Sequence, residues 1–382
     1  LSFEYSVNNS TVISYSFPGL GSTTPLYSYE DDRGEISAIP FSSAQADDIR
    51  QAFKEISKFV NITFVEIEED GSSAGTIRLA MNTITDEAGN YREGIAATAD
   101  PPSEEPRGGD VFFNKQFTSG NFSTGLVQNS ETGVGDVTVL YHEIFHALGM
   151  EHPGDNKETL FQESKNSREY TIMAGEFSIE SGADFNLNGN NYTVASTPMV
   201  YDIAPLQYLY GANMSHNASD TTYSYKPDTP FIEAIWDAGG TDTLDFSNFS
   251  KANTISLVDG EYSTIGFDVD WSMTDNLGIA FDAIIEDAIG GSGDDTIKGN
   301  DSSNSIEGGP GNDVIDGGKG NDTAVYKGLS SEFIIKNNDD GTISVEDLAI
   351  SELNEGSDSL TNIEYMKFSD KTISSISLKY SL

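Results

Sequence analysis

Residues 142–152 read HEIFHALGMEH, which places three histidines, a glutamate and a glycine at the spacing H-E-x-x-H-x-x-G-x-x-H. Residues four apart on a helix project from the same face, so the imidazoles of His142 and His146 can bind one ion. Gly149 can adopt the left-handed conformation that ends a helix, which lets the chain turn back and present His152 to that ion. Three neutral imidazoles leave one position of a tetrahedral zinc ion open to water. The pattern therefore predicts one catalytic Zn²⁺ held by these three histidines.

Glu143 stands beside the first of these histidines and is the candidate catalytic residue. A carboxylate next to a zinc-bound water can take a proton from that water and later deliver it to a leaving amine. The competing interpretation is a helix with surface histidines. The chain has only four histidines, three of them within residues 142–152, while His216 stands alone. This clustering favours the metal site.

The charge of the chain excludes some classes of partner. Its 382 residues include 20 Lys and Arg against 62 Asp and Glu, which gives a formal net charge of -42. We therefore expect no binding to nucleic acid or to an anionic membrane surface. The acidity fits a solvated surface, and it also fits the binding of many hard cations, because Ca²⁺ prefers carboxylate and carbonyl oxygens. Both interpretations stay open.

Composition also narrows the class of protein. The chain has no cysteine, so neither disulfides nor thiolate metal sites are available. No apolar run approaches the roughly 18 to 20 residues that span a bilayer, and we predict no membrane span. The first residues lack the basic and apolar regions of a secretory signal, so we expect any export signal to have been removed or to lie elsewhere.

Hydrophobic periodicity predicts strands and helices in the first half of the chain. Apolar and hydroxyl residues alternate over residues 11–17, which indicates a strand, and a helix capped by Ser42 or Ser43 is predicted from apolar residues at three- and four-residue intervals up to Val60. Further strands are predicted at 61–67, 76–81 and 111–113, and further helices at 136–148 and 201–210, the last of them ending at Gly211.

From about residue 213 the sequence becomes rich in Gly, Asp, Asn and Ser and shows no convincing helix. A prior of roughly 100 to 200 residues per domain predicts two domains, which we place at 1–212 and 213–382. Four nine-residue units then begin at Gly290, Gly299, Gly308 and Gly317, in the form G-G-x-G-x-D-x-U-x. The residues after 329 read as strands that cap this array.

These motifs resemble those of the serralysins, bacterial metzincin proteases with a C-terminal calcium-binding roll. The likeness continues through HPGD at 152–155, YTIM at 170–173, YDIA at 201–204, YGAN at 210–213 and WDAGGTDT at 236–243. It covers most of residues 40–325. It implies an α+β metzincin catalytic domain followed by an all-β domain, a parallel β-roll or β-sandwich.

The resemblance assigns roles to residues after the zinc motif. Met173 matches the methionine of the turn that lies beneath zinc in metzincins. Serralysins have a tyrosine two residues later, where it can ligate zinc at rest and donate a hydrogen bond to the intermediate, but this chain has Gly175. Tyr170 matches a different family tyrosine. We expect either a weaker donor, such as water or backbone, or slower turnover than in relatives.

The resemblance also implies several Ca²⁺ ions. One would lie between Gly291, Gly293 and Asp295 and the facing Gly308, Pro310 and Asp313. A second would lie between Asn300, Ser302 and Asn304 and the facing Gly317, Lys319 and Asp322. The second has one carboxylate fewer, so we predict that it binds more weakly. A further site would use Asn217, Ser219 and Thr221 from one loop, Asp237, Gly239, Gly240 and Asp242 from another, and Ile284 and Glu286 from a strand. For this last set, solvated turns are the alternative.

Substrate would bind by backbone pairing to the edge strand of the sheet, as metzincins usually hold an extended peptide. Residues 94–99 occupy that place before the Pro-rich loop, and the candidate strand residues are Gly94, Ile95, Ala96 and Ala97. Their small side chains suit close approach of a backbone, although a plain packing strand would look the same.

Two functions fit the sequence. The first is a secreted zinc endopeptidase, monomeric and extracellular, with protein or peptide substrates and with calcium stabilising the second domain. The resemblance implies a bacterial source and export by a C-terminal signal. The second is a non-catalytic, calcium-dependent binding or adhesion protein with a vestigial zinc site, an idea motivated by Gly175. The intact set of ligands and base favours the first.

Overall fold

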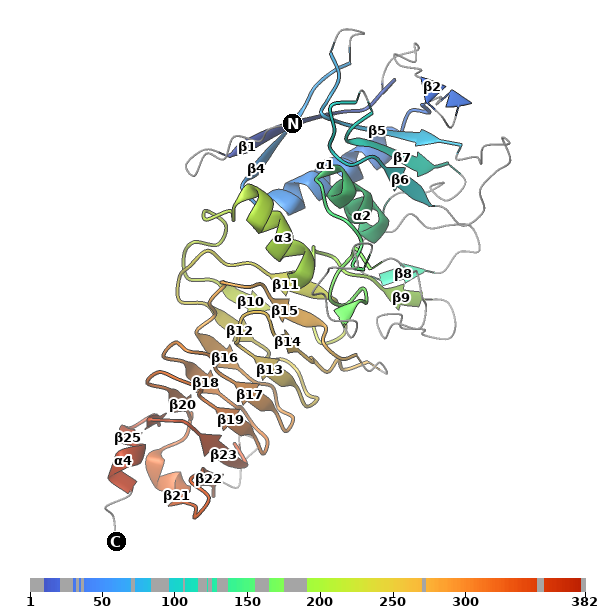
Figure 1. Ribbon diagram of the computed structural model, residues 1–382. Coiled ribbons are helices and arrows are strands. Elements are labelled where there is room, and N and C mark those ends of the chain that lie inside the picture. Colours follow the sequence, from blue (N-terminus) through green and yellow to red (C-terminus); the bar gives the residue numbers. More distant parts are fainter. Residues whose placement is uncertain are drawn as a thin grey trace. The chain divides into compact units, whose positions relative to one another are not determined.

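The computed structural model divides into two compact units, Leu1–Asn213 and Met214–Leu382 (Figure 1). The structure describes residues 10–20, 30–31, 34–35, 38–69, 73–83, 96–105, 107–115, 122, 126–128, 137–154, 165–174, 191–269, 273–348 and 354–378. No helix among these residues is long and apolar enough to cross a membrane.

The first unit is built on a five-stranded sheet in the order β4-β1-β5-β7-β6. All neighbours are parallel except β6, which pairs antiparallel with β7 at one edge. The strands are β1 Thr11–Ser16, β4 Ile62–Glu66, β5 Ile77–Asn82, β6 Ala97–Ala99 and β7 Asp110–Asn114; two short pairs join β2 Glu30–Asp31 to β3 Gly34–Glu35 and β8 Leu126–Gln128 to β9 Asn191–Thr193.

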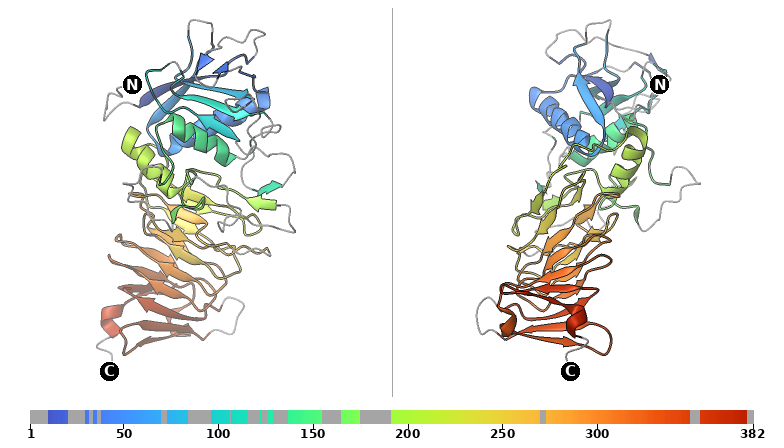
Figure 2. Two further views of the ribbon diagram at one scale, coloured as in Figure 1. Left: turned by 45° about the vertical axis from the view of Figure 1, so that its right-hand side comes forward. Right: turned by 90° about the vertical axis from the view of Figure 1, so that its left-hand side faces the viewer.

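Two helices cover one face of this sheet, α1 Ser43–Phe59 and α2 Val137–Ala147 (Figures 1 and 2). The predicted cap of α1 is confirmed, because Ser42 accepts a hydrogen bond from the Gln45 amide and the Gln45 side chain bonds back to Ser42. The apolar stripe of α1 is buried, and the Phe53 ring lies 4.4 Å from that of Tyr15 on β1. The sheet and α1 thus give α2 a rigid support.

A third helix, α3 Val200–Tyr210, ends at Gly211, whose φ is 81°. The predicted helix end at this glycine is therefore confirmed. The chain there lies against the end of α1, since the Asn61 amide donates to the Gly211 carbonyl at 2.8 Å.

The second unit contains two long sheets whose strands succeed one another as stacked rungs (Figure 2). One has the order β10-β12-β16-β18-β20-β24-β25, the other β13-β17-β19-β23-β22-β21, and a small sheet has the order β11-β15-β14. The strands are β10 Thr222–Ser224, β11 Glu233–Ile235, β12 Thr243–Asp245, β13 Thr254–Ser256, β14 Tyr262–Ser263, β15 Leu277–Ile279, β16 Asp287–Ile289, β17 Thr296–Lys298, β18 Ser305–Glu307, β19 Val314–Asp316, β20 Thr323–Val325, β21 Phe333–Asn337, β22 Ile343–Asp347, β23 Ser357–Thr361, β24 Tyr365–Lys367 and β25 Thr372–Ser374.

The nine-residue repeat sets the geometry of this roll. Each repeat gives a six-residue turn and a three-residue strand, and strands two repeats apart pair in parallel, as in β16·β18·β20 and β17·β19. The eighth residue of every unit faces the interior and is at most 1% exposed: Ile297, Ile306, Ile315 and Ala324. The predicted order of an α+β unit followed by an all-β parallel roll is confirmed.

The two sheets of the roll extend beyond the four nine-residue units on both sides. β10, β12 and β16 precede them in one sheet and β13 in the other, and β23 and β24 continue the two sheets parallel to β19 and β20. The antiparallel strands β21, β22 and β25 cap the far end, as expected. The expectation of no helix after residue 213 is wrong by two short elements, a 3₁₀ turn Ser330–Glu332 and the four-residue α4 Ser375–Leu378.

We predict that Ile315→Ala lowers the free energy of unfolding of the second unit by about 2 to 5 kcal/mol, because it empties a fully buried position between the sheets. Val314→Ala is the matched control, since the neighbouring Val314 is 49% exposed and its truncation costs about 0.5 kcal/mol or less. Denaturant unfolding in saturating Ca²⁺ measures both, and equal effects would contradict an inward-facing eighth position.

Candidate metal centre and cation-binding turns

The end of α2 explains the spacing of the histidine motif. Gly149 has φ 98°, its amide donates to the His146 carbonyl, and the Met150 amide donates to the Phe145 carbonyl, both at 2.9 Å. These two bonds form the Schellman motif that commonly ends a helix at a left-handed glycine. The chain reverses there and returns His152 to the face of α2 that carries the other two histidines, as predicted.

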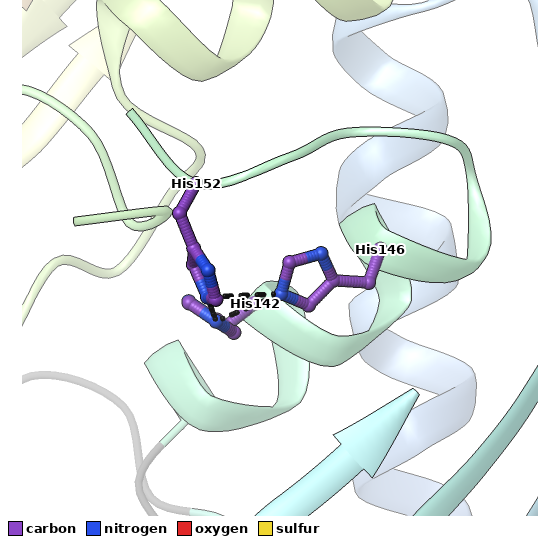
Figure 3. A group of neighbouring side chains, drawn as sticks. All are labelled: His142, His146 and His152. Atoms are coloured by element: carbon purple, nitrogen blue, oxygen red, sulfur yellow. Dashed lines mark hydrogen bonds between the residues drawn. The ribbon is translucent and has the colours of Figure 1, made fainter. Parts of the chain in front are cut away.

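The three histidines form a compact cluster (Figure 3). Their Nε2 atoms lie 3.0 Å (His142 to His152), 3.1 Å (His146 to His152) and 3.2 Å (His142 to His146) apart. A tetrahedral zinc ion about 2.0 to 2.1 Å from each nitrogen fits such a triangle. Among the described residues this is the one group of three or more His, Cys, Asp or Glu side chains close enough to share an ion.

Backbone carbonyls fix which nitrogen of each helical histidine carries the proton. His142 Nδ1 lies 2.9 Å from the Ile172 carbonyl, and His146 Nδ1 lies 2.8 Å from the Met150 carbonyl. A carbonyl can only accept, so both Nδ1 atoms donate and both Nε2 atoms present lone pairs. Burial also lowers the pKa of His142 to about 3, which keeps it neutral. Facing lone pairs repel one another unless a cation lies between them, so the donor set fits zinc.

A tight turn beneath the histidines carries Met173, which is fully buried. The turn is held from α3 by the buried carboxylate of Asp202, which accepts from Thr171 Oγ1 at 2.6 Å and from the Ile172 amide at 2.8 Å. Because Ile172 is also the carbonyl partner of His142, the carboxylate is linked to the cluster through one residue. Gly175 lies outside the described residues.

Glu143 is buried on α2 between the two helical histidines in sequence. Burial raises the pKa of its carboxyl group to about 8. A raised pKa gives a carboxylate the proton affinity that a general base at neutral pH needs. Phe145 is fully buried and stacks on Tyr141, so it is a core contact of this helix.

The described part of the candidate substrate strand contains β6. β6 comprises Ala97–Ala99 and forms the edge of the five-stranded sheet next to β7, in contact with α2. Ala97 opens this strand, and Ala96 precedes it and accepts the Asn114 amide. Gly94 and Ile95 lie outside the described residues.

The turns of the roll bring the first predicted calcium set together. The turn containing Gly291, Gly293 and Asp295 stacks on the turn containing Gly308, Pro310 and Asp313, and the Asp295 amide donates to Asp313 Oδ1 at 2.8 Å. Asp313 Oδ2 is buried without a hydrogen-bond partner, and a Cβ added to Gly308 would lie 2.1 Å from it. Burial, reinforced by neighbouring carboxylates, raises the pKa of Asp313 to about 8. A buried carboxylate oxygen without a donor fits a cation.

The second predicted set has the same arrangement on the other edge of the roll. The turn with Asn300, Ser302 and Asn304 stacks on the turn with Gly317, Lys319 and Asp322. The Asn304 amide donates to Asp322 Oδ1 at 2.8 Å, and Asp322 Oδ2 is again buried without a partner. The Asn304 side-chain amide donates to the Glu286 carbonyl. The turn before β18 therefore supplies an amide oxygen where its partner turn supplies a carboxylate.

The third predicted set gathers around Asp242. Its Oδ1 accepts from the Thr221 amide, its own amide donates to Glu286, and its Oδ2 is buried without a partner. Burial raises the pKa of Asp242 to about 6, with Asp237 and Glu286 adding to the rise. Asn217 and Ser219 lie in the loop before β10, and Gly239 and Gly240 in the turn before β12. The expectation that Ile284 and Glu286 lie in a strand is wrong: both precede β16, and Ile284 is half exposed.

Two acidic residues of the same ladders were not predicted. Asp358 accepts from the Asp313 amide at 2.9 Å, and Glu364 accepts from the Asp322 amide at 2.8 Å, each at the position that the sixth repeat residue occupies in other turns. The sequence does carry a signal for Asp358. Residues 353–361 read LNEGSDSLT, which has Gly, Asp and an apolar residue at the fourth, sixth and eighth positions of the repeat. The inserted residues 326–352 hide this degenerate unit.

Comparison with known proteins agrees with this geometry. The family model described as Matrixin matches residues 36–176, and the model described as Peptidase M10 serralysin C terminal matches residues 206–381. Among similar proteins, Serralysin G of Dickeya chrysanthemi is 33% identical over 70% of this chain and 55% of its own length. Serralysin of Proteus mirabilis is 30% identical and Metallopeptidase AprA of Pseudomonas marginalis 32% identical, each over 79% of this chain and 62% of its own length.

The matches thus span about half to three fifths of the length of these relatives. The two family models fall on the two halves of the chain, one over the histidine cluster and one over the roll. On this evidence the chain belongs to the serralysin family.

Proposed function

We propose that this protein is a secreted, zinc-dependent endopeptidase that hydrolyses internal peptide bonds of proteins. The observation that carries the proposal is the convergence of three imidazole Nε2 atoms, which lie 3.0 to 3.2 Å from one another. His142, His146 and His152 would hold the ion and leave one coordination position for water.

Zinc bound there would polarise the scissile carbonyl and make the attacking water more acidic. Glu143 would accept the proton of that water on a carboxylate oxygen and then deliver it to the leaving amide nitrogen. Its burial supports this role, because the raised pKa lets the carboxyl group hold a proton between the two steps. The Ile172 and Met150 carbonyls keep two imidazoles oriented throughout.

Protein substrates would lie as an extended strand along β6. This edge of the sheet has no further strand beside it among the described residues, and the strand is built of the small residues Ala97, Thr98 and Ala99. Hydrogen bonds between this edge and a substrate backbone depend little on the substrate's side chains, which favours a broad range of protein substrates. Where Gly175 replaces the family tyrosine, water or backbone would donate to the developing oxyanion.

Calcium would bind the turns of the roll and stabilise its folded form. The partnerless oxygens of Asp242, Asp313 and Asp322 support three sites, one in each predicted set. Without cations these buried carboxylates repel one another, so the second unit would fold where Ca²⁺ is plentiful, as it is outside the cell. This coupling is the physical reason for proposing an extracellular location and folding after export.

We predict that Glu143→Ala lowers kcat for casein hydrolysis by about 10²- to 10⁴-fold, because the general base is lost, while one zinc per chain is retained. Proteolysis assays and metal analysis of the purified variant measure both quantities. Zinc-loaded wild-type protein that hydrolyses no protein substrate would contradict the proposed activity and favour a binding or adhesion protein.

The control for this variant is Glu151→Ala, which removes an exposed carboxylate from the same motif and should leave activity unchanged. His142→Ala serves as the opposite control, because it removes a ligand and should lose zinc and activity together.

Calcium titration should resolve a tighter and a weaker class among the repeat sites, the weaker one containing Asn304 in place of a carboxylate. Asp313→Asn should remove the tighter class, because it takes the charge from a buried and partnerless oxygen. Isothermal titration calorimetry of the chelator-treated full chain is the measurement. The control is Asp339→Asn, which changes the net charge equally at an exposed position and should alter neither class. Equal affinities at the two repeat sites would refute the predicted order of affinities.

A further inference from the structure

The Schellman motif at the end of α2 leaves the Leu148 carbonyl without a partner inside the motif. Gly149 and Met150 donate to the His146 and Phe145 carbonyls, whereas Leu148, which is buried, has a carbonyl that no later backbone amide reaches within the motif. An unpaired buried carbonyl is costly, so its partner influences how the chain leaves the helix.

That partner is the side chain of Tyr210. Its hydroxyl donates to the Leu148 carbonyl at 2.6 Å across a sequence separation of 62 residues, and the tyrosine is itself buried. Tyr210 lies in the last turn of α3. The phenol is therefore a long-range cap on the helix that carries two of the three histidines.

The end of α3 is in turn fixed to the end of α1. Gln207 Nε2 donates to the Phe59 carbonyl at 3.0 Å, and Asn213 Nδ2 donates to the Ser57 carbonyl at 2.7 Å. With the bond from the Asn61 amide to the Gly211 carbonyl, these contacts hold the Tyr210 backbone against a helix that is anchored in the core. These contacts therefore fix the position of the Tyr210 hydroxyl.

The segment that Tyr210 caps leads directly to the metal cluster. Two residues after Leu148, the Met150 carbonyl orients His146 through Nδ1 at 2.8 Å, and two residues further on stands His152. We propose that Tyr210 is a positioning residue of the zinc site, acting through Leu148 on the orientation of His146 and the placement of His152. This inference rests on the proposed zinc site.

The start of α3 influences His142, the remaining histidine of the cluster. Asp202 fixes the Ile172 amide, and the Ile172 carbonyl orients His142. One helix therefore sets both sides of the cluster, with Asp202 near its start and Tyr210 at its end. Loss of the Tyr210 contact would loosen His146 and His152, whereas loss of the Asp202 contact would loosen His142.

The test is Tyr210→Phe, which removes the hydroxyl alone. Zinc affinity is measured by competition with a chromophoric chelator on the full chain with Ca²⁺ present. Removal of partners that orient metal ligands typically weakens binding 10- to 100-fold, and we expect about 10-fold here because Tyr210 acts through the backbone. The matched control is Tyr15→Phe, which removes another buried hydroxyl with one bond, to Glu66 at 3.2 Å, on a strand away from the histidines.

Zinc binding by Tyr210→Phe that equals wild type, or an equal loss in Tyr15→Phe, would overturn the positioning role. Wild-type protein that binds no zinc would instead overturn the proposed function, so the two failures are distinguishable. If Tyr210→Phe does not fold, Gln207→Met removes an anchor of the same helix end, and we expect it to weaken zinc binding several-fold; an unchanged affinity there would count against the inference in the same way.

Discussion

The histidine cluster depends on two backbone carbonyls that each accept a hydrogen bond from an imidazole Nδ1–H. With Nδ1 of His142 and His146 bonded to the Ile172 and Met150 carbonyls, their Nε2 lone pairs must point into one space. The resulting triangle of Nε2 atoms has sides near 3 Å, which matches the spacing of nitrogen ligands around a tetrahedral zinc ion. The fold of the first unit places the Ile172 and Met150 carbonyls next to the Nδ1 atoms of His142 and His146.

Both carbonyls belong to turns rather than to regular elements, and α3 supports both turns. Asp202 secures the turn of Ile172, and Tyr210 secures the helix end before Met150. The helix is fixed to α1, which packs on the sheet through Phe53 and its neighbours. Rigidity thus passes from the hydrophobic core to the ligand nitrogens through a few hydrogen bonds of 2.6 to 3.0 Å.

The sequence predicts the parts of this arrangement that are local. The helical spacing of His142 and His146 and the left-handed Gly149 follow from the geometry of one helix and its end, and the structure has both. Contacts between distant segments were not predicted, because no short pattern encodes a bond such as that from Tyr210 to Leu148. The degenerate unit with Asp358 was missed for the same reason: an insertion breaks the period while the sheet restores the register.

The proposed chemistry requires three neutral imidazoles to converge on a single zinc ion with one position left for water. X-ray absorption spectroscopy at the zinc edge, on the full chain loaded with one equivalent of zinc, tests it most directly. We expect three imidazole nitrogens about 2.0 to 2.1 Å from the metal and one oxygen ligand at a similar distance. Zinc lost on dialysis, or a spectrum with fewer than three imidazole ligands, would contradict it.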